Sequence, residues 1–439
     1  MGQLRNLHCD KIGKKMADSA LLKHFKKICE IPHCSYETEA MKAYLVDLCK
    51  GYGYDVTVDA ANNILAKKEG SKVTLQAHYD MVCIGVEYPL VLKEQEGWLS
   101  ADGSTLGADN GIGMAMMLAL MESGEEVDCL FTAEEEVGLL GARGLDLKLA
   151  TPCLLNLDSE EEGIVTIGCA GGVDIIATKK LDRQKRALHL YAFHIADLPG
   201  GHSGVDIDKN IPNAISLLFK KLCATTSYIV DVDGGERRNS IPKKADILFG
   251  LETKENIDGA EYLGFREAEV MGESCAIIEL LAGFESGVRA LNRELNIVQT
   301  SINLALIESS KERLRVQLSG RSMDRGDLLA LEKESRDYFV KAGFDVVSEG
   351  FYSPWKPEKN SFSDLVLTET KVLFEGAGYG AIHAGLECGI IKEKYPDILM
   401  ASIGPTILYP HSNREKVELA SVERVFTTLK NIVRTYNDA

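Results

Sequence analysis

The sequence predicts an α/β protein, because four apolar runs have the composition of buried strands and segments of helical period lie between them. Each run stops at side chains of a type that binds metals. These are His78 and Asp80 after residues 73–77, Glu134, Glu135 and Glu136 after residues 127–132, Asp158 after residues 154–157, and His411 in the loop after residues 398–403. Since α/β sheets bind ligands beyond the carboxyl ends of their strands, we expect these side chains to converge in one crevice.

Size and charge narrow the class of protein. A chain of 439 residues is about three times the usual domain length, so at least two domains are expected. The net charge of −17 argues against nucleic acid or an anionic membrane surface as a partner, since both attract clustered Lys and Arg. Residues 1–10 lack the apolar core of a signal peptide, and no apolar run approaches the roughly 20 residues of a membrane span. We therefore expect a cytoplasmic protein.

The first elements of the chain are helices. Helical spacing from residue 20 to residue 50, broken at Ile31-Pro32, predicts two helices. Residues 110–121 predict an apolar helix that starts directly after Asp109. On this pattern alone, Asp109 is equally consistent with a plain N-cap and with a site residue.

The order of the later elements indicates an insertion. A charged break at residues 179–183 precedes an α+β pattern, with strands expected at 188–195 and 314–318, a glycine-rich turn at 199–204, and helices at 211–223 and 328–342. Residues 352–357 resemble a return linker. We therefore expect residues 1–178 and 358–439 to form one domain and residues 179–357 to form an inserted domain.

The eleven cysteines are expected to be reduced. Their number is odd, none forms a Cys-x-x-Cys pair, and Cys129, Cys153 and Cys275 lie in apolar stretches typical of buried free thiols. A core of this size does not need a disulfide framework. Cys388 is expected to pack in the interior rather than to act as a nucleophile.

The charged ends of the apolar runs predict a metal site. His78 and Asp80 share a face of an extended segment, so the Asp80 carboxylate can orient the imidazole. Alone, this pair is more typical of a surface histidine, and each acidic patch alone is typical of a solvated surface. Together they would crowd repelling charges into one cleft, and cations resolve that conflict. Nitrogen and oxygen ligands suit zinc best and manganese or cobalt next, and two such ions can hold a hydroxide and polarise a carbonyl.

Several motifs, in their order and spacing, resemble the di-zinc exopeptidase family, which includes carboxypeptidases, aminoacylases and peptidase T. They are His78-x-Asp80, Gly107-Ala108-Asp109-Asn110-Gly111, Glu135-Glu136-Val137-Gly138, Asp158, Gly200-Gly201-His202-Ser203-Gly204 and Pro410-His411-Ser412. Within that family the chain is most similar to the aminoacyl-histidine dipeptidase (bacterial carnosinase-like) group. The motifs that carry this are residues 200–207, Thr300-Ser301-x-Asn303-Leu304, Arg321-Ser322, Trp355-Lys356-Pro357 and residues 382–389. The resemblance covers nearly the whole chain and implies a three-layer αβα catalytic domain with a mixed central sheet and an inserted α+β lid domain.

The resemblance also implies a role for each metal-site residue. Asp109 bridges two zinc ions, His78 and Asp158 complete one site, and Glu136 and His411 complete the other. Glu135 is the general base and Asp80 is the partner of His78. The glycine at 138 selects Glu135 over Glu134, because the family's Glu pair is followed by one residue and then a glycine.

The inserted domain is implied to handle the substrate. His202 contacts the scissile carbonyl or its oxyanion, in many relatives within the site of a partner subunit, so a homodimer is a candidate assembly. Asn239, Arg321 and His383 bind the polar groups of the substrate and its free carboxylate. Arg321 as a surface residue of a strand and His383 as a buried structural histidine remain alternatives.

The implied function is hydrolysis of dipeptides of the aminoacyl-histidine type, with two zinc ions per chain, or cobalt or manganese in their place, and an activated hydroxide. A tripeptidase, a carboxypeptidase and an N-acyl amino acid amidohydrolase are alternatives with the same chemistry. Alternatives of another class are a non-catalytic metal-dependent binding protein and a nucleotide-binding enzyme. The last is disfavoured, because the glycine-rich stretches 107–113 and 376–380 lack the order of strand, Gly-x-Gly-x-x-Gly and helix.

Overall fold

The computed structural model describes residues 19–438, which form two compact units. The first unit contains the chain up to Gly168, Pro357–Ala381 and the chain from Leu386 onward, and the second contains Cys169–Lys356 and Ile382–Gly385. The second unit is therefore inserted in the sequence of the first. Residues 169–178 belong to the second unit rather than the first, because their strand pairs on both sides with strands of that unit. The expectation for residues 1–10 lies outside the described residues.

The first unit is built on a mixed sheet of eight strands in the order β1-β2-β6-β3-β7-β21-β8-β20. The strands are β1 (Asp55–Val58), β2 (Ile64–Lys67), β3 (Val73–His78), β6 (Asp128–Thr132), β7 (Cys153–Asn156), β8 (Ile164–Cys169), β20 (Gly378–Ile382) and β21 (Leu399–Ser402). The neighbours β6, β3, β7 and β21 run parallel, whereas β1, β2 and β8 pair antiparallel. The predicted α/β class with a mixed central sheet is confirmed.

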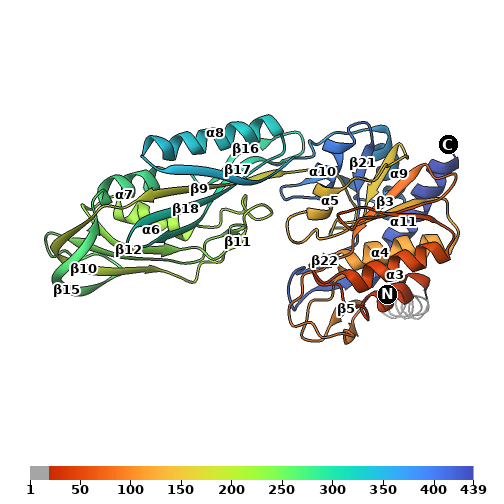
Figure 1. Cartoon of the computed structure of the whole chain (residues 1–439), viewed down its shortest axis with the longest axis horizontal. Helices are drawn as coiled ribbons and strands as arrows, with labels where there is room; N and C mark the ends of the chain where they lie inside the picture. The colour runs from red at the N-terminus through yellow and green to blue at the C-terminus, as the bar shows by residue number, and fades with distance from the viewer. Residues whose placement is uncertain (1–18, 439) are drawn as a thin grey trace. The chain divides into compact units, whose positions relative to one another are not determined.

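Helices cover both faces of this sheet. They are α2 (Ala20–Ile28), α3 (Glu39–Gly51), α4 (Ala108–Glu122), α5 (Leu140–Gly144), α9 (Ser361–Leu373), α10 (Glu387–Lys394) and α11 (Leu419–Asp438). Helix α4 packs on β3, α2 and α11, whereas α5 packs on α10. In Figure 1, α5 and α10 lie on the opposite side of the sheet from α4 and α11.

The local sequence explains these elements. Helix α4 is apolar around its circumference and almost wholly buried, as expected of a central helix. Strands β3 and β6 are buried at every position, which is the pattern of parallel strands covered on both faces. Ser19 caps α2 by accepting a hydrogen bond from Leu22 N, and Asn360 with Ser363 forms a capping box at α9. The break at Ile31-Pro32 separates α2 from α3, as predicted.

A small antiparallel sheet presents one part of the site. Its strands are β4 (Leu92–Gln95), β5 (Trp98–Ala101), β22 (Ile407–Leu408) and β23 (Lys416–Glu418), in the order β22-β23-β5-β4. The hairpin between β22 and β23, residues 409–415, carries His411. The pairing of Ile407 with Val417 holds together the two strands from which this loop projects.

The second unit is an α+β structure around an antiparallel sheet in the order β15-β10-β14-β12-β17-β18-β9-β19, with β16 paired to β17. Its strands are β9 (Gly171–Lys180), β10 (Arg183–Ile195), β12 (Tyr228–Gly234), β14 (Ala245–Leu251), β15 (Ala260–Met271), β16 (Gly287–Asn292), β17 (Ile297–Ser309), β18 (Arg313–Ser322) and β19 (Asp345–Tyr352). A separate pair consists of β11 (Gly201–His202) and β13 (Ser240–Ile241), and the helices are α6 (Ala214–Leu222), α7 (Ser274–Gly283) and α8 (Arg325–Lys341). The predicted strands at 188–195 and 314–318 and helices at 211–223 and 328–342 correspond to β10, β18, α6 and α8.

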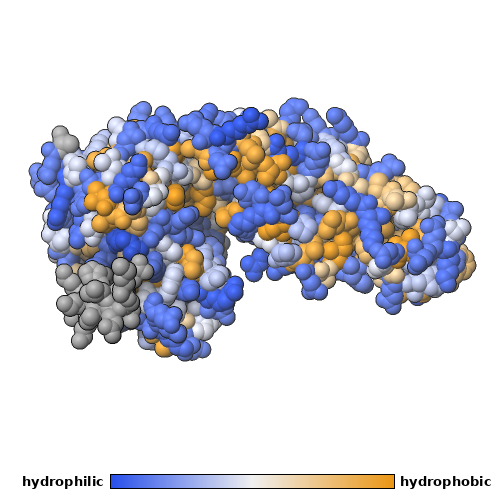
Figure 2. Space-filling view, turned by 180° about the vertical axis from the view of Figure 1, so that it is seen from behind, coloured by the Kyte–Doolittle hydropathy of each residue, from blue (hydrophilic) through white to orange (hydrophobic). Residues whose placement is uncertain are grey.

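The surface of each unit is mainly hydrophilic on the face drawn in Figure 2, with hydrophobic side chains between the charged ones. Scattered exposed hydrophobic residues are ordinary for a folded protein. None of the helices within residues 19–438 has both the length and the apolar character needed to cross a membrane.

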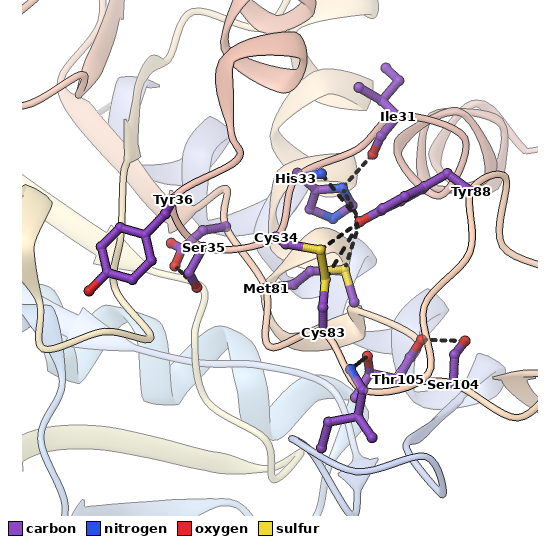
Figure 3. The surroundings of a disulfide bond; sticks show 12 residues. Ile31, His33, Cys34, Ser35, Tyr36, Met81, Cys83, Tyr88, Ser104 and Thr105 are labelled. Carbon is purple, nitrogen blue, oxygen red and sulfur yellow. Dashed lines mark hydrogen bonds between the residues drawn. A yellow bond between two sulfur atoms is a disulfide. The ribbon is translucent and has the colours of Figure 1, made fainter.

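Cys34 and Cys83 form a disulfide bond, which corrects the expectation that all the cysteines are reduced (Figure 3). Backbone pairing brings the two segments together, since Met81 N donates to His33 O at 3.1 Å and Ser35 N donates to Met81 O at 3.2 Å. The spacing of the two cysteines in the sequence carries no local sign of this pairing.

The other cysteines of residues 19–438 form no disulfide bond. Cys129, Cys153 and Cys388 are buried, as expected, whereas Cys275 is exposed, so its expected burial is wrong. Cys275 lies on α7, and a different face of this helix, with Ile277, Ile278 and Leu281, is the buried one.

We expect removal of the disulfide to destabilise the protein. The bond closes a loop with a sequence separation of 49, and a crosslink of this kind typically stabilises by about 2–4 kcal/mol. The Cys34→Ser, Cys83→Ser double variant should unfold at a lower urea concentration than the wild type, and a thiol reductant should shift only the wild-type curve. Cys223→Ser, which removes an exposed free thiol, serves as the control. Identical wild-type unfolding curves with and without reductant would contradict the bond.

Candidate metal centre

The carboxyl ends of three neighbouring parallel strands meet at the site. Strand β3 ends at His78, which pairs with Thr132 at the end of β6, and β7 ends two residues before Asp158. Glu135 and Glu136 lie three and four residues after the last residue of β6, Thr132. The apolar runs therefore deliver their terminal side chains to one edge of the sheet, as the sequence predicted.

Asp109 lies at the start of α4, and its carboxylate reaches the same edge of the sheet, next to His78. It has φ −84° and ψ 105°, and Asn110 is also non-helical, so the regular helix begins after both. The side-chain amide of Asn110 donates to Asp158, which links the Asp109 segment to the end of β7. The expectation of a helix starting directly after Asp109 is thus confirmed to within one residue.

The carboxylate of Asp109 lies between two imidazoles. Its Oδ1 is 3.1 Å from His78 Nε2, and its Oδ2 is 3.1 Å from His411 Nε2. His78 Nε2 also lies 3.3 Å from Asp158 Oδ1, and His411 Nε2 lies 2.9 Å from Glu136 Oε2. The five side chains thus form a chain of alternating carboxylates and imidazoles with Asp109 at its centre.

Ligand-type atoms of these residues gather into three groups, each within 4.8 Å: His78, Asp109 and Asp158; Asp109, Glu136 and His411; and His78, Glu135 and Glu136. The first two groups share Asp109. Carboxylates outnumber imidazoles in this cluster, and Glu136 Oε1 is buried with no hydrogen-bond partner among the described residues. An orphaned carboxylate oxygen in such a set of nitrogen and oxygen donors fits divalent cations of the zinc type.

The protonation of the cluster reflects this crowding. Burial lowers the pKa of His411, but its hydrogen bonds to Asp109 and Glu136 outweigh burial and raise the pKa to about 11. Burial, together with the charge of Asp109, raises the pKa of Glu136 to about 7. Cation binding at this cluster would therefore compete with protons for the same ligand atoms.

Asp80 orients the site in a different manner from the one expected. The ring Nδ1 of His78 donates to the backbone carbonyl of Asp80 at 2.9 Å, while the nearest carboxylate oxygen is 3.6 Å away. The carboxylate instead accepts hydrogen bonds from Ser35 Oγ (2.8 Å), Glu135 N (2.8 Å) and Glu136 N (3.3 Å). The carbonyl fixes the ring with Nε2 turned toward Asp109, and the carboxylate fixes the backbone of the two glutamates.

Glu134 and Glu135 have different surroundings. Glu134 accepts hydrogen bonds from Tyr36 N at 2.7 Å and Thr38 Oγ1 at 3.1 Å, which hold its carboxylate against the 36–38 segment. Glu135 belongs to a ligand-type group with His78. Burial and the charges of neighbouring carboxylates, Glu136 first, raise the pKa of Glu135 well above its usual range, although the charge of His78 opposes this.

A buried polar layer beneath the site was not predicted. Glu387, at the start of α10, is fully buried and accepts hydrogen bonds from Gln76 Nε2 at 2.6 Å and Thr132 Oγ1 at 2.5 Å. Asn156 Nδ2 donates to Gln76 Oε1 at 2.6 Å. The layer therefore joins α10 to the ends of β3, β6 and β7. In the sequence, this layer is marked by a polar residue near the end of each apolar run: Gln76, Thr132 and Asn156.

His383 and Arg321 are buried in the second unit. His383 Nε2 lies 2.8 Å from Ser301 Oγ, and burial, the charge of Arg321 and the charge of His202 lower the pKa of His383 to about 3. Arg321 is buried and donates to the Tyr352 hydroxyl at 2.9 Å.

His202 and Asn239 come together through the short pair of strands in the second unit. His202 pairs with Ser240, and Ser203 N donates to the carbonyl of Asn239 at 2.8 Å. Asn239 therefore contributes its backbone to the turn that carries His202.

The sequence is 32% identical to the cytosol non-specific dipeptidase of Escherichia coli (strain K12), in an alignment that covers 93% of this chain and 96% of that protein. The chain belongs to the family of that dipeptidase. The family resemblance drawn from the motifs is thereby confirmed. The profile of peptidase family M28 matches residues 63–165, a stretch that includes His78, Asp109 and Asp158.

Two solved structures share the fold of this chain. The aminoacylhistidine dipeptidase of Vibrio alginolyticus superposes with a TM-score of 0.80 at 31% identity, covering 95% of this chain and 96% of that one. A tripeptidase of Staphylococcus aureus superposes with a TM-score of 0.61 at 16% identity, covering 96% of this chain and 98% of that one. At that identity, the tripeptidase shows only that the fold is shared.

Glu387 should make the metal-free protein less stable as the pH rises. Burial raises its pKa from the usual 4.5 to about 8, so between these values the unfolded chain is ionised while the folded chain keeps the proton. The resulting loss is about 1.4 kcal/mol per pH unit where only the unfolded state is ionised. Glu387→Gln cannot ionise and should lose less stability between pH 5 and pH 8. Urea-unfolding free energies at several pH values, with the exposed Glu375→Gln as control, measure this, and parallel profiles for Glu387→Gln and the wild type would refute it.

Proposed function

We propose that this chain is a metal-dependent dipeptidase, a hydrolase for short peptides of the aminoacyl-histidine type. One observation carries the proposal: the two carboxylate oxygens of Asp109 face different imidazoles, those of His78 and His411. Each imidazole also faces a further carboxylate, Asp158 or Glu136. This arrangement suits a carboxylate shared by two cations, because the nitrogen and oxygen donors divide evenly on either side of it.

Two divalent cations fit the donor set. His78, Asp109 and Asp158 would hold one, and Asp109, Glu136 and His411 would hold the other. Imidazole and carboxylate ligands favour zinc, with cobalt or manganese as substitutes. When bound, such ions polarise a carbonyl and lower the pKa of water.

Glu135 is the proposed general base. Its carboxylate would accept a proton from the attacking water and donate it to the nitrogen of the leaving amine. Its burial supports this role, because a desolvated carboxylate binds a proton more readily. Glu134 is a weaker candidate, because Tyr36 and Thr38 already bind its carboxylate.

The second unit is the proposed lid domain, and His202 is its proposed catalytic residue. Its Nδ1 accepts hydrogen bonds from Gly204 N at 3.3 Å and Val205 N at 3.2 Å, so the neutral ring carries its proton on Nε2. An N–H donor of this kind suits a developing oxyanion. If His202 acts in the site of a partner subunit, the working assembly is a homodimer.

Asn239, Arg321 and His383 are the proposed substrate-binding residues. Arg321 Nε is buried and lacks a hydrogen-bond partner among residues 19–438, so part of its guanidinium is available to a carboxylate. A peptide whose free carboxylate pairs with Arg321 would be measured from its carboxyl end, which favours very short substrates.

The family supports dipeptides as the substrate class. A tripeptidase, a carboxypeptidase or an N-acyl amino acid amidohydrolase would use the same metal chemistry and remains the alternative. The name of the Escherichia coli relative places that protein in the cytosol, which supports a cytoplasmic location for this chain.

The proposed function is tested with a substrate panel and metal removal. The purified protein should cleave dipeptides such as carnosine faster than tripeptides or N-acyl amino acids. Treatment with a chelator should abolish cleavage, and added Zn²⁺ should restore it, since the ions supply the polarisation of the carbonyl. Amine release followed by chromatography measures each rate. Inert dipeptides would reject the substrate assignment, and full activity after verified metal removal would reject the metal.

Glu135→Gln should retain the fold and bound zinc but lose at least about 10²-fold in kcat, because the amide cannot accept the proton. Steady-state kinetics and metal analysis of the same preparation check this. Glu134→Gln is the matched control, with a kcat expected close to that of the wild type. If Glu134→Gln shows the large loss instead, the two roles must be exchanged.

A further inference from the structure

Glu415 binds the backbone of the segment that presents Asp109. Its Oε2 accepts hydrogen bonds from Leu106 N at 2.8 Å and Gly107 N at 3.0 Å, and its Oε1 accepts from Ala108 N at 2.8 Å and Asp109 N at 3.2 Å. Four successive N–H groups thus converge on one carboxylate. We propose that Glu415 is a positioning residue for the metal centre, which sets the place of Asp109 relative to His411. This inference rests on the proposed function.

The interaction is buried and charge-assisted. Glu415 is only 2% exposed, so water does not compete for its oxygens. A carboxylate that accepts backbone N–H bonds in such surroundings forms stronger hydrogen bonds than a neutral acceptor. The four donors precede the regular part of α4 and have no partner within that helix. Without Glu415, the segment 106–109 would leave them unsatisfied in the interior.

The shape of the segment depends on this contact. Gly107 has φ 67° and ψ 30°, a left-handed conformation that turns consecutive N–H groups toward one point. A side chain at Gly107 would place its Cβ 2.7 Å from Met81 Sδ, so the backbone is closely packed on its other side as well. The segment is therefore held between Met81 and Glu415, with Asp109 at its end.

Glu415 also belongs to the hairpin that carries His411. Its own N–H donates to Ser412 O at 3.1 Å, which closes a turn directly after His411. The side chain of His411 is 50% exposed, and the structure places its ring against Asp109 and Glu136. Since Glu415 connects this hairpin to residues 106–109, a single side chain couples the two backbones that supply His411 and the shared Asp109.

Zinc affinity tests the inference. Glu415→Gln keeps the size of the side chain but replaces one oxygen with an NH₂ group, which would face two N–H donors. Both proposed zinc sites include Asp109, so loss of its position should weaken both. Competition of the zinc-loaded full-length protein against a chromophoric chelator should show about 10- to 100-fold weaker binding, the usual effect of removing a group that orients ligands. A role confined to stability would lower the unfolding midpoint and leave zinc affinity unchanged.

Two further variants complete the experiment. Glu418→Gln lies three residues away, where its carboxylate is 3.5 Å from Arg424, and should bind zinc like the wild type. Glu415→Asp keeps the charge but is one methylene shorter, so it should reach fewer of the four N–H groups and show weakened binding even if Glu415→Gln does not fold. Wild-type affinity in either folded Glu415 variant would overturn the inference. A wild-type protein that binds no zinc would overturn the proposed function instead.

Discussion

The central constraint on this structure is the concentration of negative charge where three parallel strands end. Among the described residues, the groups of possible metal ligands at this edge combine Asp109, Glu135, Glu136 and Asp158, all at most partly exposed, with two imidazoles. Buried carboxylates are costly unless they are paired, and the imidazoles cannot neutralise all of them. A pair of divalent cations would relieve the repulsion, and the sharing of Asp109 between His78 and His411 supplies matching donors on both sides.

The chain holds this cluster together largely through its backbone. Asp80 and Glu415 each direct a carboxylate away from the ligands and onto the N–H groups of the segments that carry them. Within residues 19–438 neither carboxylate forms an ion pair with a Lys or Arg, so both add to the negative charge of the site. Glu387 instead accepts hydrogen bonds from the neutral side chains of Gln76 and Thr132, at the ends of β3 and β6. The supporting residues therefore fix the geometry of the ligands while the charge remains available to cations.

The local pattern was sufficient for the buried strands and for the convergence of His78, Asp158 and the glutamates, whereas the mixed sheet and the place of Asp109 in the cluster came from the family resemblance. An apolar run that ends in His78 or Asp158 predicts a buried strand and places its polar end at one edge of the sheet. A local pattern does not predict which segments far apart in the sequence come into contact. The i to i+2 relation of a strand predicted the Asp80 carboxylate at the ring of His78, but strand β3 ends at His78 and the backbone carbonyl of Asp80 takes that place. Glu387 and Glu415 resemble surface glutamates in sequence, and the partner of Cys34 is set by backbone pairing at Met81.

The proposed metal centre and the proposed substrate-binding residues belong to different units of the chain. Every proposed metal ligand and the proposed base belong to the first unit, whereas His202, Asn239, Arg321 and His383 belong to the second. A buried charge cluster tolerates little change, because each substitution alters the balance of repulsion and neutralisation for all its members. Polar residues on strands of a separate unit can change without disturbing that balance. In the proposed function, the contact that would select very short peptides therefore lies in the second unit, where Arg321 would fix the free carboxylate of the peptide.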